Sequence, residues 1–370
     1  MRILHTSDWH LGSRFFGRPL TSDQAYVLDQ MINLVRELNP DVMVLAGDVF
    51  HQRRPGDEAL ELFHDTIGRL LDLGTVVVVL SGPTDDLAHL HLNARWVRQQ
   101  GLYLYSDPSQ VLSPLSLRGA RDNFSVNCWC LPYARPGKVT GETTHPAQAG
   151  RSLVETVVQR IDPGALNVFA GYVWAQGVGK RAELGPLVSP GGLPIEKRFL
   201  EYFDYAALGG SHQPLSLGPP TLRYSGGLLA TDIELDSDER SVTLIVIEDK
   251  NNIFIDEYPL RPRRAFRVLT GSMEELMRQG QEQRTGDLLV LRSQEGDLTV
   301  EQKAQLRSLG SNIVSVEAAS PLASSTAEVE LEPSDLSPLL RLLVDFHKEV
   351  GGAPLEQASL DRLRELEGRM

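Results

Sequence analysis

The sequence predicts a layered α/β protein followed by a smaller second unit. Short apolar runs alternate with longer amphipathic stretches over the first part of the chain, as strands alternate with helices in α/β folds. Many of the apolar runs are bounded by Gly, Pro or Asp, which is typical of buried strands. Beyond residue 230 the pattern changes to a strand meander and then to a compact unit with its own strands and helices.

Nine elements are expected before residue 230. The apolar runs predict buried strands at 3–6, 42–46, 76–80, 126–131, 166–170 and 205–208. Apolar residues at helical spacing predict helices at 22–38, 56–73 and 87–100. A meander with strands at 231–235, 242–247 and 253–258 follows, and we expect it to complete the first domain with a second sheet.

The remaining chain predicts a second unit and a tail. After a hinge at 259–264, strands at 266–270, 288–292 and 313–316 alternate with helices at 272–279 and 300–309. Small residues then predict a linker, and two amphipathic helices follow at 334–350 and 355–366. We therefore predict a first domain at 1–258, a small α+β domain at 259–318, a linker at 319–330 and a helical tail at 331–370.

Composition limits the possible functions. A formal net charge of −13 repels a polyanion, so any binding of nucleic acid must use local basic patches or a metal. The charge argues against an autonomous DNA binder, but less against a subunit whose partner supplies basic surface. Cys128 and Cys130 share one face of a predicted strand, and we expect them to be core thiols. With no leader and no membrane-length apolar run, we expect a cytoplasmic protein without a membrane contact.

Polar side chains that follow the predicted strands suggest a metal site. Asp8 and His10 follow the first strand, Asp48 follows the second, and His212 follows the strand at 205–208. The carboxyl ends of strands are where α/β folds bind ligands. Each residue alone also fits a helix cap or a turn, but their convergence favours a site. Two carboxylates and two imidazoles suit a transition metal such as Mn, Fe or Zn better than Ca or Mg.

These motifs resemble a known family. The opening MRILHTSDWHLG is similar to that of SbcD-type nucleases, the bacterial subunits that pair with an SbcC-type coiled-coil ATPase. The resemblance continues at LAGDVF (45–50), RYSG (223–226) and DLSPL (335–339), and so covers nearly the whole chain. It implies a calcineurin-like metallophosphoesterase β-sandwich flanked by helices, a small α+β capping domain that binds DNA, and a C-terminal helical tail.

The resemblance also implies a two-metal site, of which this sequence retains one half. In the family the two ions share the aspartate of the second motif, and a histidine of the third motif protonates the leaving oxygen. The positions that match the first ion's ligands are retained: Asp8, His10, Asp48 and His212. The positions that match the second ion's ligands and the acid are replaced by Pro83, Thr84, Tyr172 and Gly210. Pro and Gly offer no side-chain donor, and a phenol with a pKa of ~10 is a poor ligand.

We therefore expect one divalent ion in place of two, with Mn²⁺ favoured, and weak or lost hydrolysis. Loss of general acid assistance alone typically costs ~10² to 10⁴ in rate. Substitute ligands, if the site is rearranged, would be Asp85, His89 or His91. The arginines just beyond two ligand motifs either contact DNA phosphates or lie on a solvated surface: Arg14, Arg18, Arg53 and Arg54.

The tail carries an apolar stripe at helical spacing. Its residues are Leu336, Leu339, Leu342, Leu343 and Phe346. Such a stripe ordinarily packs on the chain's own core. Because the family uses its C-terminal helices to grip the ATPase, we expect these residues to bind the partner. By the same resemblance, the helices at 56–73 and 87–100 form a homodimer contact.

Three functions follow as hypotheses. The first is an SbcD-like subunit of an ATP-dependent complex that processes DNA double-strand ends, with weak or lost nuclease activity. The alternative is an active Mn-dependent DNA exonuclease and endonuclease that uses one metal or substitute ligands. The third is a small-molecule phosphoesterase, which would need neither the second domain nor the tail.

Overall fold

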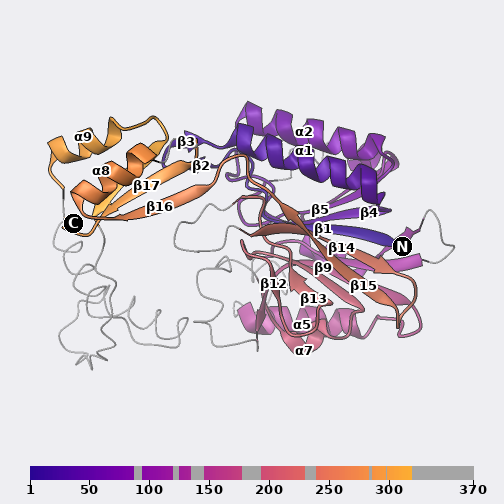
Figure 1. The fold of residues 1–370 in the computed structure, drawn as a ribbon. Helices are drawn as coiled ribbons and strands as arrows, with labels where there is room; N and C mark the ends of the chain where they lie inside the picture. The colour runs from indigo at the N-terminus through magenta and orange to yellow at the C-terminus, as the bar shows by residue number, and fades with distance from the viewer. Residues whose placement is uncertain are drawn as a thin grey trace, which may run out of the picture.

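The computed structural model describes residues 1–86, 94–119, 125–134, 146–176, 193–229, 239–282, 286–296 and 298–318. Within these ranges two sheets pack together with helices on their outer faces, and a smaller three-stranded unit lies at one end (Figure 1). The predicted α/β fold class is confirmed. The strand expected at 231–235, the linker and the tail lie outside the described residues, and the division into four segments stays a prediction. No helix that the structure describes is long and apolar enough to cross a membrane.

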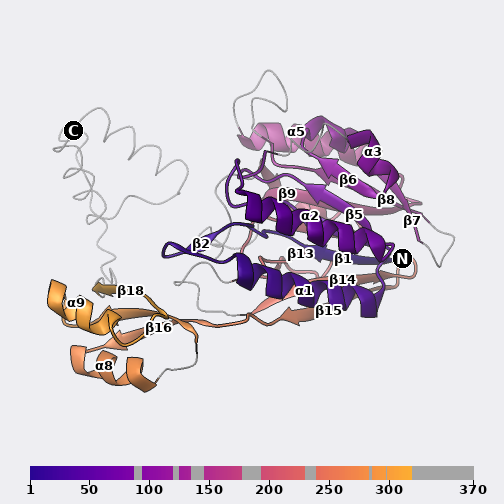
Figure 2. The ribbon, with the colours of Figure 1, turned by 90° about the horizontal axis from the view of Figure 1, so that it is seen from above.

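The first sheet is mostly parallel. Its strands, in order, are β15 (Ile253–Leu260), β14 (Arg240–Ile247), β1 (Arg2–Thr6), β4 (Val42–Ala46), β5 (Val76–Leu80) and β6 (Leu102–Tyr105). Strands β1, β4, β5 and β6 run parallel, and β14 and β15 are added antiparallel at one edge. Helices α1 (Thr21–Leu38) and α2 (Asp57–Asp72) cover the outer face (Figures 1 and 2), and α3 (Ala94–Gln99) precedes β6.

The second sheet lies beneath the first. Its strands, in order, are β12 (Leu215–Ser216), β13 (Leu222–Tyr224), β11 (Tyr205–Gly209), β9 (Leu166–Gln176), β8 (Ser125–Leu131) and β7 (Leu115–Arg118), with β10 (Leu193–Glu196) pairing with the end of β9. Its outer face carries α5 (Pro146–Val158) and α7 (Lys197–Leu200), and a 3₁₀ turn spans Pro108–Leu112. Apolar side chains from both sheets, such as Val44 and Val168, form the core between them. Cys128 and Cys130 are free thiols in this core, as expected.

The two described strands of the meander, β14 and β15, do not build the second sheet, so that expectation is wrong for them. Strand β14 pairs with β1, with Ile3 opposite Ile245, and β15 pairs with β14. Without β14, the buried strand β1 would expose one edge. Ile245 and Ile247 of β14 also fill the core between the sheets. Strands β14 and β15 therefore extend the first sheet.

The three-stranded unit follows β15. Its parallel strands β16 (Phe266–Gly271), β17 (Leu288–Ser293) and β18 (Ile313–Ala318) alternate with α8 (Met273–Glu282) and α9 (Val300–Arg307), as the sequence predicts. The unit packs against a short hairpin of β2 (Arg14–Phe15) and β3 (Arg18–Pro19), where the rings of Phe15 and Phe266 lie 4.4 Å apart (Figure 2). Arg264 adds a two-pronged ion pair to Asp23 of α1, at 2.9 and 2.6 Å.

Candidate metal centre

Three loops from two sheets meet at one edge of the sandwich. Strands β1 and β4 are parallel neighbours, so the loops after them run side by side. Asp8 N donates to Gly47 O at 3.0 Å, and His10 N donates to Asp48 O at 2.9 Å. The loop after β11 joins from the other sheet, where Gly210 N donates to Asp8 Oδ2 at 3.1 Å. The loops that follow β1, β4 and β11 thus meet, as the sequence predicts.

The backbone at this edge is held in an unusual conformation. Asp8, His10 and Asp48 have positive φ angles of 51°, 45° and 49°. Residues other than glycine rarely adopt this region, and such strain gathers at functional sites, where surrounding contacts maintain it. The hydrogen bonds between the loops supply that support.

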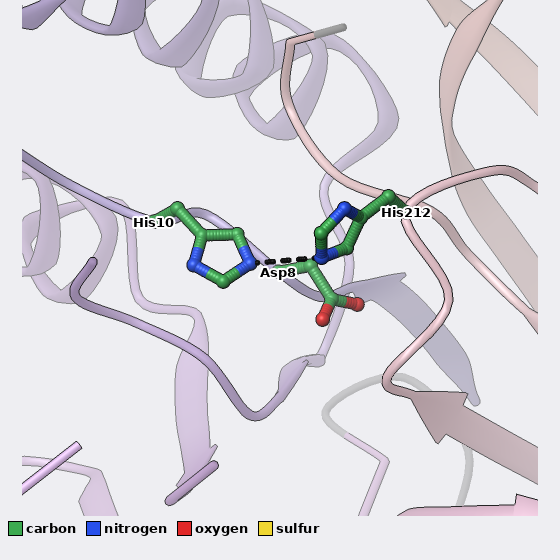
Figure 3. A group of neighbouring side chains, drawn as sticks. All are labelled: Asp8, His10 and His212. Carbon is green, nitrogen blue, oxygen red and sulfur yellow. Dashed lines mark hydrogen bonds between the residues drawn. The ribbon is translucent and has the colours of Figure 1, made fainter. Parts of the chain in front are cut away.

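Asp8, His10 and His212 form a group that could hold a metal ion. Their ligand atoms all lie within 4.8 Å of one another, and Nε2 of His10 is 3.2 Å from Nε2 of His212 (Figure 3). Two nitrogens at this spacing, each about 2.1 Å from an ion, subtend roughly 100° at it, which suits tetrahedral or octahedral coordination. The residues therefore fit a divalent transition metal.

One buried oxygen of this group supports the same conclusion. Among the described residues, Asp8 Oδ1 is buried without a hydrogen-bond partner. A buried polar atom without a partner is costly, and a bound ion would supply that partner. His10 Nδ1 also has no partner, but it points away from His212 (Figure 3), so an ion at Nε2 would not contact it. The other oxygen of Asp8 is held in place: Ser225 donates to Ser7, and Ser7 donates to Asp8 Oδ2 at 2.5 Å.

Burial disfavours the charged forms of Asp8 and His10. Burial, and next the charge of Asp48, raise the pKa of the Asp8 carboxyl well above its usual value. Burial lowers the pKa of His10 to about 4, against the opposing charge of Asp48. A divalent ion would favour the ionised form of Asp8, and neutral imidazole is the form that binds a metal.

Asp48, the fourth predicted ligand, lies beside this group but faces other donors. Its Oδ2 is 3.9 Å from His10 Nε2. Tyr172 donates its phenol O–H to Asp48 Oδ2 at 2.7 Å. The hydroxyl and the backbone N–H of Thr84 lie 2.5 and 3.2 Å from Asp48 Oδ1. Two of the residues that replace the expected second-ion ligands and acid therefore contact the shared aspartate directly.

Of the three predicted substitute ligands, the structure describes only Asp85. Asp85 is buried and accepts backbone N–H groups of Val49, Phe50 and Gly82 at 3.1, 2.8 and 2.7 Å. Burial, and next the charge of Asp48, raise its pKa to about 7. Asp85 thus ties the loop after β4 to the loop after β5. His89 and His91 lie outside the described residues.

The structure adds one residue that the sequence did not single out. The ring of His51 lies edge-on to that of His10, with centroids 5.9 Å apart, and His51 is exposed. It follows Asp48 by three residues, and like several other histidines of the sequence it could in principle replace a lost ligand, but no local pattern distinguishes it. Its backbone N–H donates to Leu11 O, next to a parallel bridge between Leu11 and Phe50 that holds the two loops together.

The four candidate arginines lie near these loops, and three of them contact backbone carbonyls. Arg14 donates to Gly17 O at 2.6 Å, and Arg53 donates to Pro83 O at 3.4 Å. Arg18 donates to Ser311 O in the three-stranded unit. Arg54 is exposed. Their contact with DNA phosphates stays a prediction.

The chain is similar in part to several known proteins. Residues 1–149 match the family model of calcineurin-like phosphoesterases. A protein of Thermus thermophilus is 11% identical, with 70% of this chain and 99% of that one covered and a TM-score of 0.41. A dimetal phosphatase from Danio rerio is 10% identical, with 71% and 97% covered and a TM-score of 0.40. An archaeal phosphodiesterase is 11% identical, with 70% and 100% covered and a TM-score of 0.31.

Proposed function

We propose that this chain is an SbcD-like subunit of an ATP-dependent complex that processes and repairs DNA double-strand ends, with weak or lost nuclease activity of its own. The observation that carries the proposal is the asymmetry around Asp48. The group of Asp8, His10 and His212, which could hold an ion, lies beside it. Thr84 and Tyr172, which stand where the resemblance expects an acid and a second-ion ligand, hydrogen-bond to its carboxylate. The resemblance of the opening motif and of the tail supports the placement in a DNA-processing complex.

Weak hydrolysis follows from the chemistry of the retained half. A bound divalent ion would supply a Lewis acid and lower the pKa of its water, but a two-metal site also clamps the attacking and leaving oxygens together. Thr84, in the position of the family's acid, lies against Asp48 Oδ1 and Phe50 O, and a hydroxyl cannot protonate a leaving group at neutral pH. We expect at most about one tightly bound transition metal per chain, with Mn²⁺ favoured.

The alternative is an active Mn-dependent nuclease with a rearranged site. Asp85 does not favour it, because both of its oxygens accept backbone N–H groups. His51 is the observation in its favour, since its ring lies beside that of His10. A small-molecule phosphoesterase remains the third candidate, although the three-stranded unit attached to the hairpin exceeds what such an enzyme needs.

The partners belong to the same proposal. Double-stranded DNA ends would be the substrate or ligand, and an SbcC-type coiled-coil ATPase would bind the tail at 331–370. A homodimer would form through α2 and the predicted helix at 87–100. The exposed arginines near the ligand loops, Arg14, Arg53 and Arg54, would contact phosphates.

A comparison of two substrates tests the function. The full chain, with and without an SbcC-type ATPase, is given Mn²⁺ and either duplex DNA ends or a chromogenic phosphodiester. The proposal expects ATPase binding and DNA binding, with little cleavage by this chain of either substrate. Robust DNA cleavage that His51→Ala abolishes would favour the rearranged nuclease. Cleavage of only the chromogenic ester, with no ATPase binding, would favour the small-molecule enzyme.

A further inference from the structure

The ring of Tyr172 lies in a slot lined by two glycines. Tyr172 lies on β9 and is 1% exposed. Gly47 and Gly210 both lie against its ring, with φ angles of +97° and +106°. A Cβ at Gly47 would overlap the Tyr172 ring, and a Cβ at Gly210 would lie 3.3 Å from Tyr172 Cζ. The ring therefore occupies space next to both positions that a larger side chain there would need.

The slot aims the phenol at Asp48. The Tyr172 O–H donates to Oδ2 at 2.7 Å, and Thr84 approaches Oδ1 with its hydroxyl at 2.5 Å and its N–H at 3.2 Å. Asp48 is 1% exposed, so its negative charge needs compensation inside the protein. Short hydrogen bonds to a carboxylate are about twice as strong as those between neutral groups. These donors therefore provide part of the charge compensation that a cation would otherwise provide to Asp48.

We infer that Tyr172 and Thr84 take the place of the second metal ion at Asp48, as positioning residues that hold its carboxylate beside a one-ion site. The expected second ion does not fit: Pro83 and Gly210 offer no side-chain donor, and the Tyr172 ring covers Gly210. On this basis the site holds one ion. It differs from a two-ion site that has only lost ligands, because hydrogen-bond donors occupy the place of the second ion. The inference rests on the proposed function in one respect: the resemblance behind that function is the reason to expect a second ion beside Asp48.

The inference makes a directional prediction for Tyr172→Phe. This variant keeps the ring in its slot and removes only the O–H. Asp48 Oδ2, 3.9 Å from His10 Nε2, then becomes free to turn toward the first ion's ligands. We expect the Mn²⁺ dissociation constant to fall, because Asp48 Oδ2 could then add a carboxylate ligand to the ion. If Asp48 already ligates the ion and Tyr172 only orients it, the same substitution would instead weaken binding by about 10- to 100-fold.

Electron paramagnetic resonance of Mn²⁺ measures both affinity and number of ions on the full chain. Wild type, Tyr172→Phe and Thr84→Val are titrated with Mn²⁺. Tyr133→Phe is the matched control, because the Tyr133 ring lies edge-on to Tyr172 at 6.1 Å but the variant leaves the hydrogen bond to Asp48 intact. One ion in every protein, tighter binding in Tyr172→Phe and unchanged binding in Tyr133→Phe would support the inference.

Three outcomes would overturn it: two ions bound by wild type, weaker binding in Tyr172→Phe, or identical affinities in all four proteins. None of these measurements uses DNA or the ATPase. A failure of the inference is therefore distinguishable from a failure of the proposed function, which the binding and cleavage assays report.

Discussion

Replacing Gly210 by histidine should not restore a second metal ligand unless Tyr172 is replaced as well. By the resemblance described above, Gly210 stands where a ligand of the second ion is expected. Its φ of +106° and the Tyr172 ring at 3.3 to 3.5 Å from an added Cβ oppose any side chain. The variant Gly210→His should therefore be destabilised and should bind no more Mn²⁺ than wild type.

The size of the effect has two parts. The positive φ costs a residue with a Cβ about 1 to 3 kcal/mol. The imidazole beyond that Cβ must displace the Tyr172 ring, and overpacking a filled core typically adds about 1 to 3 kcal/mol. Tyr172→His in the same chain removes the second part and leaves the first. The double variant should thus be more stable than the sum of the singles predicts, by about 1 to 3 kcal/mol.

Urea unfolding of the two single variants and the double variant measures this coupling. Gly74→His is the matched control for the backbone cost, because Gly74 has a φ of +82° and nothing within 4 Å of an added Cβ. Gly210→His should lose more stability than Gly74→His. Equal losses in these two variants, or additive effects in the double variant, would refute the role of the Tyr172 ring.

Activity should need more than these two changes. Thr84→His supplies an acid but removes the hydroxyl that contacts Asp48. Pro83→Asn, Thr84→His, Tyr172→His and Gly210→His together should raise Mn-dependent cleavage of duplex ends far more than the singles combined, because residues that act as a unit are strongly non-additive. A single variant that restores cleavage would contradict this expectation.

Three further predictions concern parts away from the second-ion position. Burial, and next the charge of Arg223, lower the pKa of His5 to about 3. Stability that is present above pH ~6.5 should therefore be lost as the pH falls toward 3, by up to roughly 4 to 5 kcal/mol. In urea unfolding His5→Gln should reduce this pH dependence, while His64→Gln, at an exposed histidine, should leave it unchanged. Asp85→Asn should lower the free energy of unfolding by roughly 2 to 5 kcal/mol, because backbone N–H groups lose their acceptor; a change below about 1 kcal/mol would show that the loops hold without it. Deletion of residues 331–370 should leave a folded chain that no longer binds a coiled-coil ATPase in a pull-down, whereas a much lower melting temperature would place the tail's apolar stripe in the core.

Local sequence patterns predict much of this protein. The apolar runs and helical spacings match β1, β4, β5, α1 and α2 to within a residue or two, because each pattern reflects which face of one element is buried. The same holds for the three-stranded unit, except that α8 ends at Glu282, later than the predicted helix at 272–279. The ligand motifs also follow from local pattern: Asp8 and Asp48 come directly after parallel strands, whose carboxyl ends share an edge.

The sequence by itself therefore determined the α/β class, the edge that carries the site and the residues that cannot ligate. Only the tertiary structure decided how Asp48 is held and which sheet the meander joins. Tyr172 and Asp48 are 124 residues apart, and their contact depends on how two sheets face each other. Likewise β14 reaches β1 across almost the whole first domain. Such contacts depend on packing between distant segments, and the apolar periodicity within a single helix or strand does not predict them.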